Sequence, residues 1–173
     1  MSDLKYPIGK YVMPEAFTDR ERKALIATIA GAPAALRAAV KGLDDHQLDT
    51  PYRPEGWTVR QVVHHLPDSH MNAYIRVKWG LTEAEPTIKT YAEERWAELP
   101  DSAGPIAVSL DLLDALHRRW VSLLEQIGPD DFARTVHHPE LGVLRVDQLL
   151  GAYAWHGGHH IAHVTRLRSR MGW

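Results

Sequence analysis

The stretch "AYAWHGGHHIAHV", residues 152–164, is the most unusual part of the chain. Its periodicity is that of a helix, yet it holds two adjacent glycines and four histidines in thirteen residues. Each glycine destabilises a helix by roughly 1 kcal/mol relative to alanine, and histidine is a mediocre helix former. A helix built from these residues is therefore expected to do more than pack.

One line along this helix combines apolar residues and histidines. At about 100° per residue, its members are Leu149, Tyr153, His156, His160, His163 and Leu167. His156 and His160 are four residues apart, so their Cβ atoms lie about 5–6 Å apart on one face. This spacing suits two imidazoles that reach one metal ion, whereas a single histidine on such a line is usually a hydrogen-bonded core residue. His159 lies at the edge of the line and is a weaker ligand candidate.

Gly157 and Gly158 lie between the two candidate ligands. Because glycine has no side chain, they could admit a substrate at this turn or let a neighbouring helix approach closely. The sequence leaves both explanations open.

Composition restricts the class of protein. The 173 residues, 45% hydrophobic and 24% charged, predict a single globular domain over residues 1–173. With a net charge of −2, we expect no nucleic-acid partner, and the absence of cysteine excludes disulfides and thiolate metal sites. There is no signal peptide pattern and no run of about 18 apolar residues, so we expect no membrane partner and a cytoplasmic location.

Four amphipathic helices are predicted, over residues 18–43, 58–82, 105–127 and 145–172. Thr18 and Thr58 begin the first two as capping boxes, and Asp147 is a plausible cap of the last. Prolines inside the first two helices, Pro33 and Pro67, are expected to bend them. For the third helix, the periodicity predicts a buried stripe of Leu112, Leu116, Trp120, Leu123 and Ile127.

The connections are less regular. Residues 87–99 are predicted to form a short extra helix in a long crossover, and residues 128–144 a short helical turn or a small hairpin. The expected fold is all-α, a four-helix bundle.

A second histidine cluster lies in "WTVRQVVHHLPDSHMN", residues 57–72. The apolar line of this helix contains His70, whereas His65 lies near a more polar line with Asp68, so periodicity does not decide which one joins the site. His64 is expected at the surface, as are His137 and His138.

Several motifs resemble one known family. Trp57 and Thr58, followed by His65 with Leu66 and Asp68, are similar to the early motif of the DinB/YfiT-like superfamily, and "AWHGGHHIAH" resembles its late His-x3-His. The segments "YPIG" (6–9), "LDTPYR" (48–53), "HPE" (138–140) and "RMGW" (170–173) resemble its YfiT branch of metal-dependent hydrolases. The similarity extends from Tyr6 to Trp173.

The resemblance implies a four-helix bundle, dimeric in this branch, that binds one zinc or nickel ion per chain through His65, His156 and His160. The sequence departs from the family at Pro67, where a helix former is expected, and at His163, where many members have glutamine. Three histidines leave open metal positions, as in catalytic sites. Asp68 could orient an imidazole, and His163, less plausibly His117, could carry a proton.

Three functions are compatible with these residues. The first is a metal-dependent hydrolase that uses an activated water on a small-molecule substrate. The second is a metal-dependent S-transferase of a low-molecular-weight thiol of the bacillithiol type, and the third is a non-catalytic metal-binding bundle or dimerisation module. A cavity lined by an arginine such as Arg76 or Arg95 would favour the second over the first. The large aromatics Trp79 and Trp96 indicate a homodimer interface.

Overall fold

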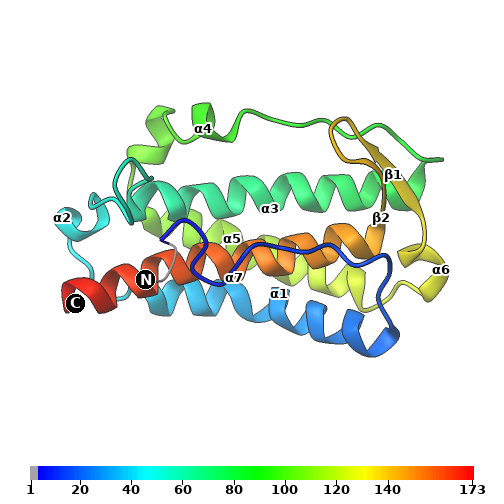
Figure 1. The fold of residues 1–173 in the computed structure, drawn as a ribbon, viewed down its shortest axis with the longest axis horizontal. Coiled ribbons are helices and arrows are strands. Elements are labelled where there is room, and N and C mark those ends of the chain that lie inside the picture. The colour runs from blue at the N-terminus through cyan, green and yellow to red at the C-terminus, as the bar shows by residue number, and fades with distance from the viewer. Residues whose placement is uncertain (1–3) are drawn as a thin grey trace.

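The computed structural model describes residues 4–173, in which four long helices lie side by side (Figure 1). These are α1 (Asp19–Val40), α3 (Val59–Thr82), α5 (Ile106–Leu124) and α7 (Val146–Met171). The short helices are α2 (Asp45–Leu48), α4 (Glu93–Trp96), the 3-10 helix η1 (Pro100–Ala103) and α6 (Pro129–Phe132). The predicted all-α four-helix bundle is thus confirmed. Of the short helix predicted over residues 87–99, only Glu93–Trp96 is α-helical.

The order of the helices in space differs from a simple up-and-down bundle. α3 and α5 follow each other in the chain but run in the same direction, because the crossover of residues 83–105 returns along the whole length of the bundle (Figure 1). α1 packs against α5 and α7, and α3 packs against the same two helices. α3 and α7 are therefore antiparallel neighbours, which brings the two histidine clusters together.

Local sequence explains where the first two long helices begin. Thr18 Oγ1 accepts a hydrogen bond from the Glu21 amide at 3.3 Å, and Thr58 Oγ1 accepts one from the Gln61 amide at 3.1 Å. In both cases the glutamate or glutamine side chain accepts from the threonine amide in return, which completes the capping box. α1 and α3 continue as helices through Pro33 and Pro67.

The start of α7 differs from the prediction. Asp147 does not cap the helix: residue 145 is the N-cap, and Asp147 lies fully buried in the first turn. Its Oδ2 accepts hydrogen bonds from Arg145 Nη2 at 2.9 Å and from Arg22 Nη1 at 3.3 Å. Asp147 therefore joins the start of α7 to α1 through a buried ion pair.

Trp120 of α5 is buried as predicted, but the rest of the buried stripe does not consist of the predicted residues. The residues that α5 buries are Leu110, Leu113, His117, Trp120 and Leu124. Leu112, which the sequence predicted inside, is exposed. Leucines on both sides of the true stripe allow either choice from periodicity, and the observed one carries His117 into the core.

Residues 128–144 contain both of the predicted alternatives, a short helix, α6, and a small hairpin. β1 (Thr135–His138) pairs antiparallel with β2 (Gly142–Arg145). The start of the crossover joins this hairpin, because the Ile88 amide donates to the His137 carbonyl at 2.9 Å. His137 is exposed, as predicted, but it lies in a strand, and His138 is only partly exposed.

One helix, α1, is long and apolar enough to cross a membrane by length and composition. It packs against α5 and α7 and carries the buried Arg22. The core helix of a soluble protein passes the same test, so this property is weak support for a membrane span.

Candidate metal centre

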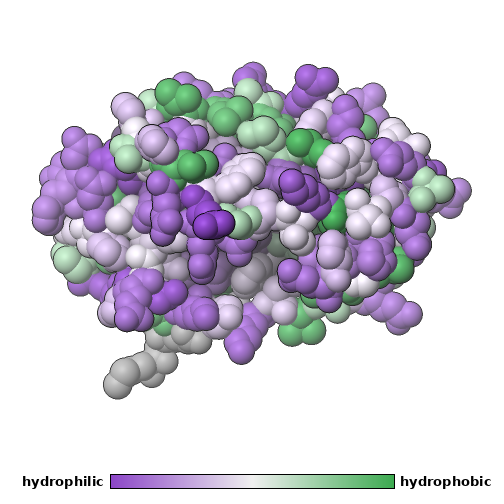
Figure 2. Space-filling model, turned by 90° about the horizontal axis from the view of Figure 1, so that it is seen from above, coloured by the Kyte–Doolittle hydropathy of each residue, from purple (hydrophilic) through white to green (hydrophobic). Residues whose placement is uncertain are grey.

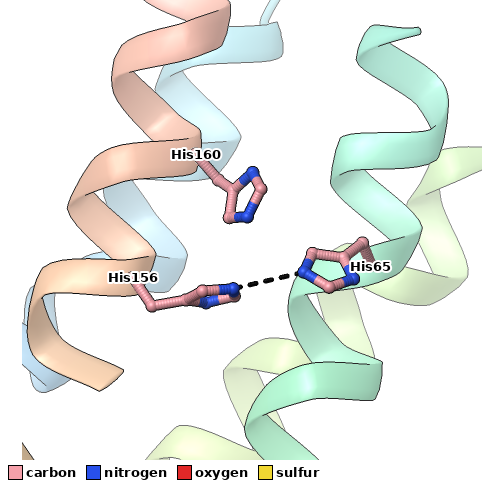
Figure 3. Close-up of side chains that lie close together, drawn as sticks. All are labelled: His65, His156 and His160. Atoms are coloured by element: carbon pink, nitrogen blue, oxygen red, sulfur yellow. Dashed lines mark hydrogen bonds between the residues drawn. The ribbon is translucent and has the colours of Figure 1, made fainter. Parts of the chain in front are cut away.

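Three imidazoles from two helices meet between α3 and α7 (Figure 3). His65 comes from α3, and His156 and His160 come from adjacent turns of α7. One ring nitrogen from each lies within 4.8 Å of the other two, and His65 Nε2 is 3.2 Å from His156 Nε2. In the described part of the chain, residues 4–173, this is the single group of three or more histidine or carboxylate side chains with such spacing.

The spacing fits a divalent ion. Zinc–nitrogen bonds are about 2.0–2.1 Å, so two tetrahedral ligands lie about 3.3 Å apart. The 3.2 Å separation of the two Nε2 atoms agrees with this value. His160 Nδ1 is buried without a hydrogen-bond partner, so no hydrogen bond engages this nitrogen. The residues present therefore fit a metal ion held by three nitrogens.

Burial keeps these rings neutral, which is the form that binds a metal. Desolvation lowers the pKa of His65 to about 4. It also lowers the pKa values of His156 and His160 well below the ordinary range, and the neighbouring imidazoles lower them further. Neutral lone pairs directed at one point are consequently available throughout the physiological pH range.

The three histidines line one side of a cavity of about 550 Å³. Trp57 covers the cluster, with its ring centroid 4.6 Å from that of His65 and stacked 6.1 Å from that of His160. Tyr11, from the N-terminal segment, also lines the cavity. This volume falls in the range of small-molecule sites.

An arginine lies in the wall of the same cavity. Arg76, 7% exposed, donates hydrogen bonds to Tyr153 Oη and to the Lys89 carbonyl, each at 2.6 Å, while its Nε has no partner. It takes part in none of the ion pairs among residues 4–173. A buried cation without a carboxylate is costly for the protein alone. Arg95 is exposed and does not line the cavity.

The two predicted catalytic residues lie away from the open side of the cluster. His163 is stacked on Tyr52 at 3.9 Å and its Nε2 lies 3.2 Å from the Lys5 carbonyl; burial lowers its pKa to about 4. Within residues 4–173, the Asp68 carboxylate makes no hydrogen bond to an imidazole. Burial and then the charge of Asp101 raise the pKa of Asp68 to about 6. Neither residue lines the cavity, so these positions do not support the predicted proton-transfer and orienting roles.

Other histidines occupy places that the sequence did not predict. His64 is buried, with Nδ1 2.7 Å from Ser109 Oγ and Nε2 3.0 Å from the Gly104 carbonyl, so the surface prediction was wrong. His159 is buried beside Trp155. His70 and His117 are almost fully buried next to the cluster, and their nitrogens are 2.8 Å apart. The true stripe of α5 would have indicated His117.

The adjacent glycines have different neighbours. A Cβ on Gly157 would lie 3.4 Å from His70 Cε1 and 3.7 Å from Ala32 Cβ, so α7 approaches both α3 and α1 here. A Cβ on Gly158 would lie 3.7 Å from Ile8 of the N-terminal segment. These are ordinary van der Waals distances, so an alanine would fit at either position, and neither glycine lines the cavity.

Comparison with known proteins assigns the family. Residues 28–164 match the DinB superfamily. The chain belongs to this superfamily of four-helix-bundle proteins.

Close relatives are found in Bacillus. Proteins from Bacillus cereus and Bacillus mycoides, each named a "Putative metal-dependent hydrolase", are 54% identical over the full length of both chains. The solved structure of YfiT from Bacillus subtilis, described as "a probable metal-dependent hydrolase with an unusual four-helix bundle topology", is 48% identical, covers 98% of each chain and has a TM-score of 0.95. The four-helix bundle protein TT2238 shares the fold, with a TM-score of 0.56 at 20% identity over 88% of this chain and 99% of that one.

Proposed function

We propose that this protein is a metal-dependent hydrolase whose ion is held by His65, His156 and His160. The observation that supports this most is the convergence of three neutral imidazoles, 3.2 Å apart at the closest pair, on the wall of a 550 Å³ cavity. Three protein ligands leave room for a substrate or water, which is the arrangement of catalytic sites. The names of the relatives agree with this class of activity.

The ion and the side chains around it have different roles in the proposed reaction. The bound ion, zinc or nickel, would act as a Lewis acid and lower the pKa of a water molecule. The histidines hold it, and Trp57 shields two of them from solvent. Two tyrosines line the cavity wall: Tyr153 Oη is bonded to Arg76, and Tyr11 Oη is buried without a hydrogen-bond partner.

A second candidate is S-transfer from a low-molecular-weight thiol, and Arg76 is the observation that favours it. Arg76 and His65 are eleven residues apart on α3, close to three full turns, so they lie on one face about 16 Å apart along the axis. A thiol that also carries a carboxylate could place its sulfur at the histidines and its carboxylate at the unpaired guanidinium. The absence of cysteine means that the sulfur comes from outside the chain.

Turnover with and without thiol separates these two functions. Zinc-loaded, nickel-loaded and chelated protein should be assayed with 4-nitrophenyl acetate alone, and with 1-chloro-2,4-dinitrobenzene plus a thiol. In the second reaction a C–S bond replaces the C–Cl bond, and chloride and the thiol proton are released. Metal-dependent ester cleavage supports the hydrolase, whereas metal- and thiol-dependent chloride release supports the transferase. Equal rates with chelated protein in both assays would contradict both.

The role of Arg76 is tested with matched variants. Arg76→Gln should raise KM at least about tenfold for a thiol that carries a carboxylate, because a charged hydrogen bond is lost. The same change should have little effect on a neutral thiol such as 2-mercaptoethanol. Arg95→Gln, at an exposed arginine outside the cavity, serves as the control. An equal effect of Arg76→Gln on both thiols would exclude a carboxylate site.

A further inference from the structure

Four histidines and one carbonyl form a continuous chain of hydrogen bonds that crosses the bundle. His117 Nδ1 lies 2.7 Å from the Ile29 carbonyl oxygen, and His117 Nε2 lies 2.8 Å from His70 Nδ1. His70 Nε2 lies 3.3 Å from His156 Nδ1, and His156 Nε2 faces His65 in the cluster. The chain thus runs from α1 through α5 and α3 to α7.

The carbonyl at one end fixes the direction of every bond. A carbonyl oxygen only accepts, so His117 Nδ1 carries a hydrogen and donates it to Ile29. In a neutral imidazole the other nitrogen is then an acceptor, so His117 Nε2 accepts from His70 Nδ1–H. By the same rule His70 Nε2 accepts from His156 Nδ1–H. The hydrogen of His156 is therefore on Nδ1, and its Nε2 carries a lone pair that faces His65.

We propose that His70 and His117 are positioning residues that select the Nδ1–H tautomer of His156 and so present Nε2 to the ion. This inference rests on the proposed metal site for its purpose, but the tautomer itself does not require a metal. Ligating histidines generally donate their second N–H to a neighbouring acceptor, which fixes the ring and strengthens metal binding. Here that acceptor is a histidine, which is in turn held by another histidine and a main-chain carbonyl.

The surroundings of the two rings support a specific role. His70 and His117 are each 1% exposed, stacked on one another at 4.9 Å, and both contact the edge or face of Trp120. A purely apolar pair would fill this space without two polar rings to satisfy. Each nitrogen of the two rings has a partner in the chain of bonds, whereas the Nδ1 atoms of His159, His160 and His163 have none.

The first test is made on metal-free wild-type protein. Nitrogen-15 NMR of the imidazole side chains distinguishes Nδ1–H from Nε2–H, and we expect His156, His70 and His117 all to carry the hydrogen on Nδ1. A hydrogen on Nε2 of His156 would overturn the proposal. Because no metal is present, this result is independent of whether the proposed function is correct.

The second test measures zinc affinity by competition with a chelator. His117→Phe removes the acceptor for His70 and should weaken zinc binding about 10–100-fold, the usual effect of losing an outer-sphere partner. His117→Gln can place its side-chain oxygen near the position of Nε2 and should retain more of the affinity. His64→Phe, which removes a buried histidine with two hydrogen bonds outside this chain, controls for lost packing.

The outcomes of the second test are distinct. Weaker zinc binding by folded His117→Phe with partial recovery in His117→Gln supports the positioning role. If His117→Phe binds zinc as tightly as wild type, the role is excluded. If His117→Phe does not fold, the comparison of His117→Gln with wild type and the wild-type NMR spectrum decide. Wild-type protein that shows the Nδ1–H tautomer but binds neither zinc nor nickel would contradict the proposed function alone.

Discussion

His160 is the candidate ligand whose Nδ1 is buried without a hydrogen-bond partner. We expect His160→Ala to lose zinc affinity at least about 100-fold, more than the loss of an outer-sphere contact. Its helical circular dichroism should be retained, because the apolar clusters of the bundle do not depend on this ring. Elemental analysis and circular dichroism of the purified variant check both statements.

The comparison must be made with chelated wild-type protein, which has also lost its ion. The two should then melt within a few degrees of each other, apart from the cost of the small cavity left by the imidazole. If His160→Ala unfolds while chelated wild type stays folded, His160 is a core residue and the proposed metal centre is wrong.

The buried imidazoles make the stability of the metal-free protein depend on pH. The pKa of His65 is about 4 in the folded protein, against about 6.5 for an exposed imidazole. Between these values the unfolded chain takes up a proton that the folded chain does not, so stability falls as pH falls. His65 alone accounts for a loss on the order of 3 kcal/mol between pH 6.5 and pH 4. His163, with a pKa of about 4, adds to it.

Urea unfolding of chelated protein at pH 7, 6, 5 and 4.5 measures this loss. Asp68 acts in the opposite direction, because its pKa is raised to about 6 and the folded state takes up its proton first. Because this one carboxyl group acts against several histidines, the free energy of unfolding should still decrease as pH falls. A free energy of unfolding that stays constant from pH 7 to pH 4.5 would show that the rings are not desolvated as described.

Which histidines reach the cluster could be predicted only in part, because contacts between helices decide it. The His-x3-His of α7 follows from helical periodicity alone, because the residues share one helix. The choice of His65 over His70 did not follow, since both lie on α3 and only the neighbouring helices decide which ring reaches the cluster. His70 proved to be buried on the apolar line, as the periodicity indicated, with its nitrogens bonded to histidines of α5 and α7.

At the level of the helices, the N-terminal segment packs directly against α7 at Gly151. A Cβ on Gly151 would lie 2.5 Å from Phe17 Cζ and 2.6 Å from Tyr11 Oη. Gly151→Ala should therefore displace this segment and destabilise the protein by about 1–3 kcal/mol, although alanine is the better helix former. Hydrogen exchange of residues 8–18 and urea unfolding report the two effects.

Gly31 in α1 is the matched control, because a Cβ there meets no atom within 4 Å. Gly31→Ala should stabilise the protein by about 0.5–1 kcal/mol. If both alanine variants are stabilised alike, the contacts of Gly151 are not restrictive.

Features of a helix could be predicted from the sequence when neighbouring residues in the chain determine them. The capping boxes at Thr18 and Thr58 need only four consecutive residues and were predicted correctly. The face of α5 was not, because leucines flank the buried stripe on both sides and the choice is made by contacts with α1 and α3. Asp147 has the residue type of a helix cap, but its partner Arg22 lies 125 residues away, so their pairing could not be predicted from the local sequence.

For the whole molecule, we expect a homodimer. Trp79 and Ile75 lie one turn apart on α3 and are 37% and 39% exposed, and Trp96 on α4 is 38% exposed. Polar side chains cover much of the face that includes the crossover, and several apolar ones adjoin one another near its edge (Figure 2). Half-exposed tryptophans are typical of interfaces. Light scattering at micromolar concentration should give about twice the 19.5 kDa of one chain.

Trp79→Glu should shift this mass toward that of the monomer, because a charge is placed in the buried part of the interface. Val108→Glu, at a 71% exposed position of α5, is the control and should leave the dimer intact. A wild-type mass of 19.5 kDa would contradict the dimer.

The parallel pairing of α3 and α5 also affects how fast the chain can fold. In an up-and-down bundle each helix packs on the next, so most contacts are local and folding takes microseconds to milliseconds. Here α1 packs on α7, and consecutive α3 and α5 meet only after the crossover of residues 83–105 has returned along the bundle. The entropy of closing these long loops is lost before their contacts form. Refolding should consequently be slower than for an up-and-down bundle of similar length and stability, at a rate closer to that of mixed α/β domains.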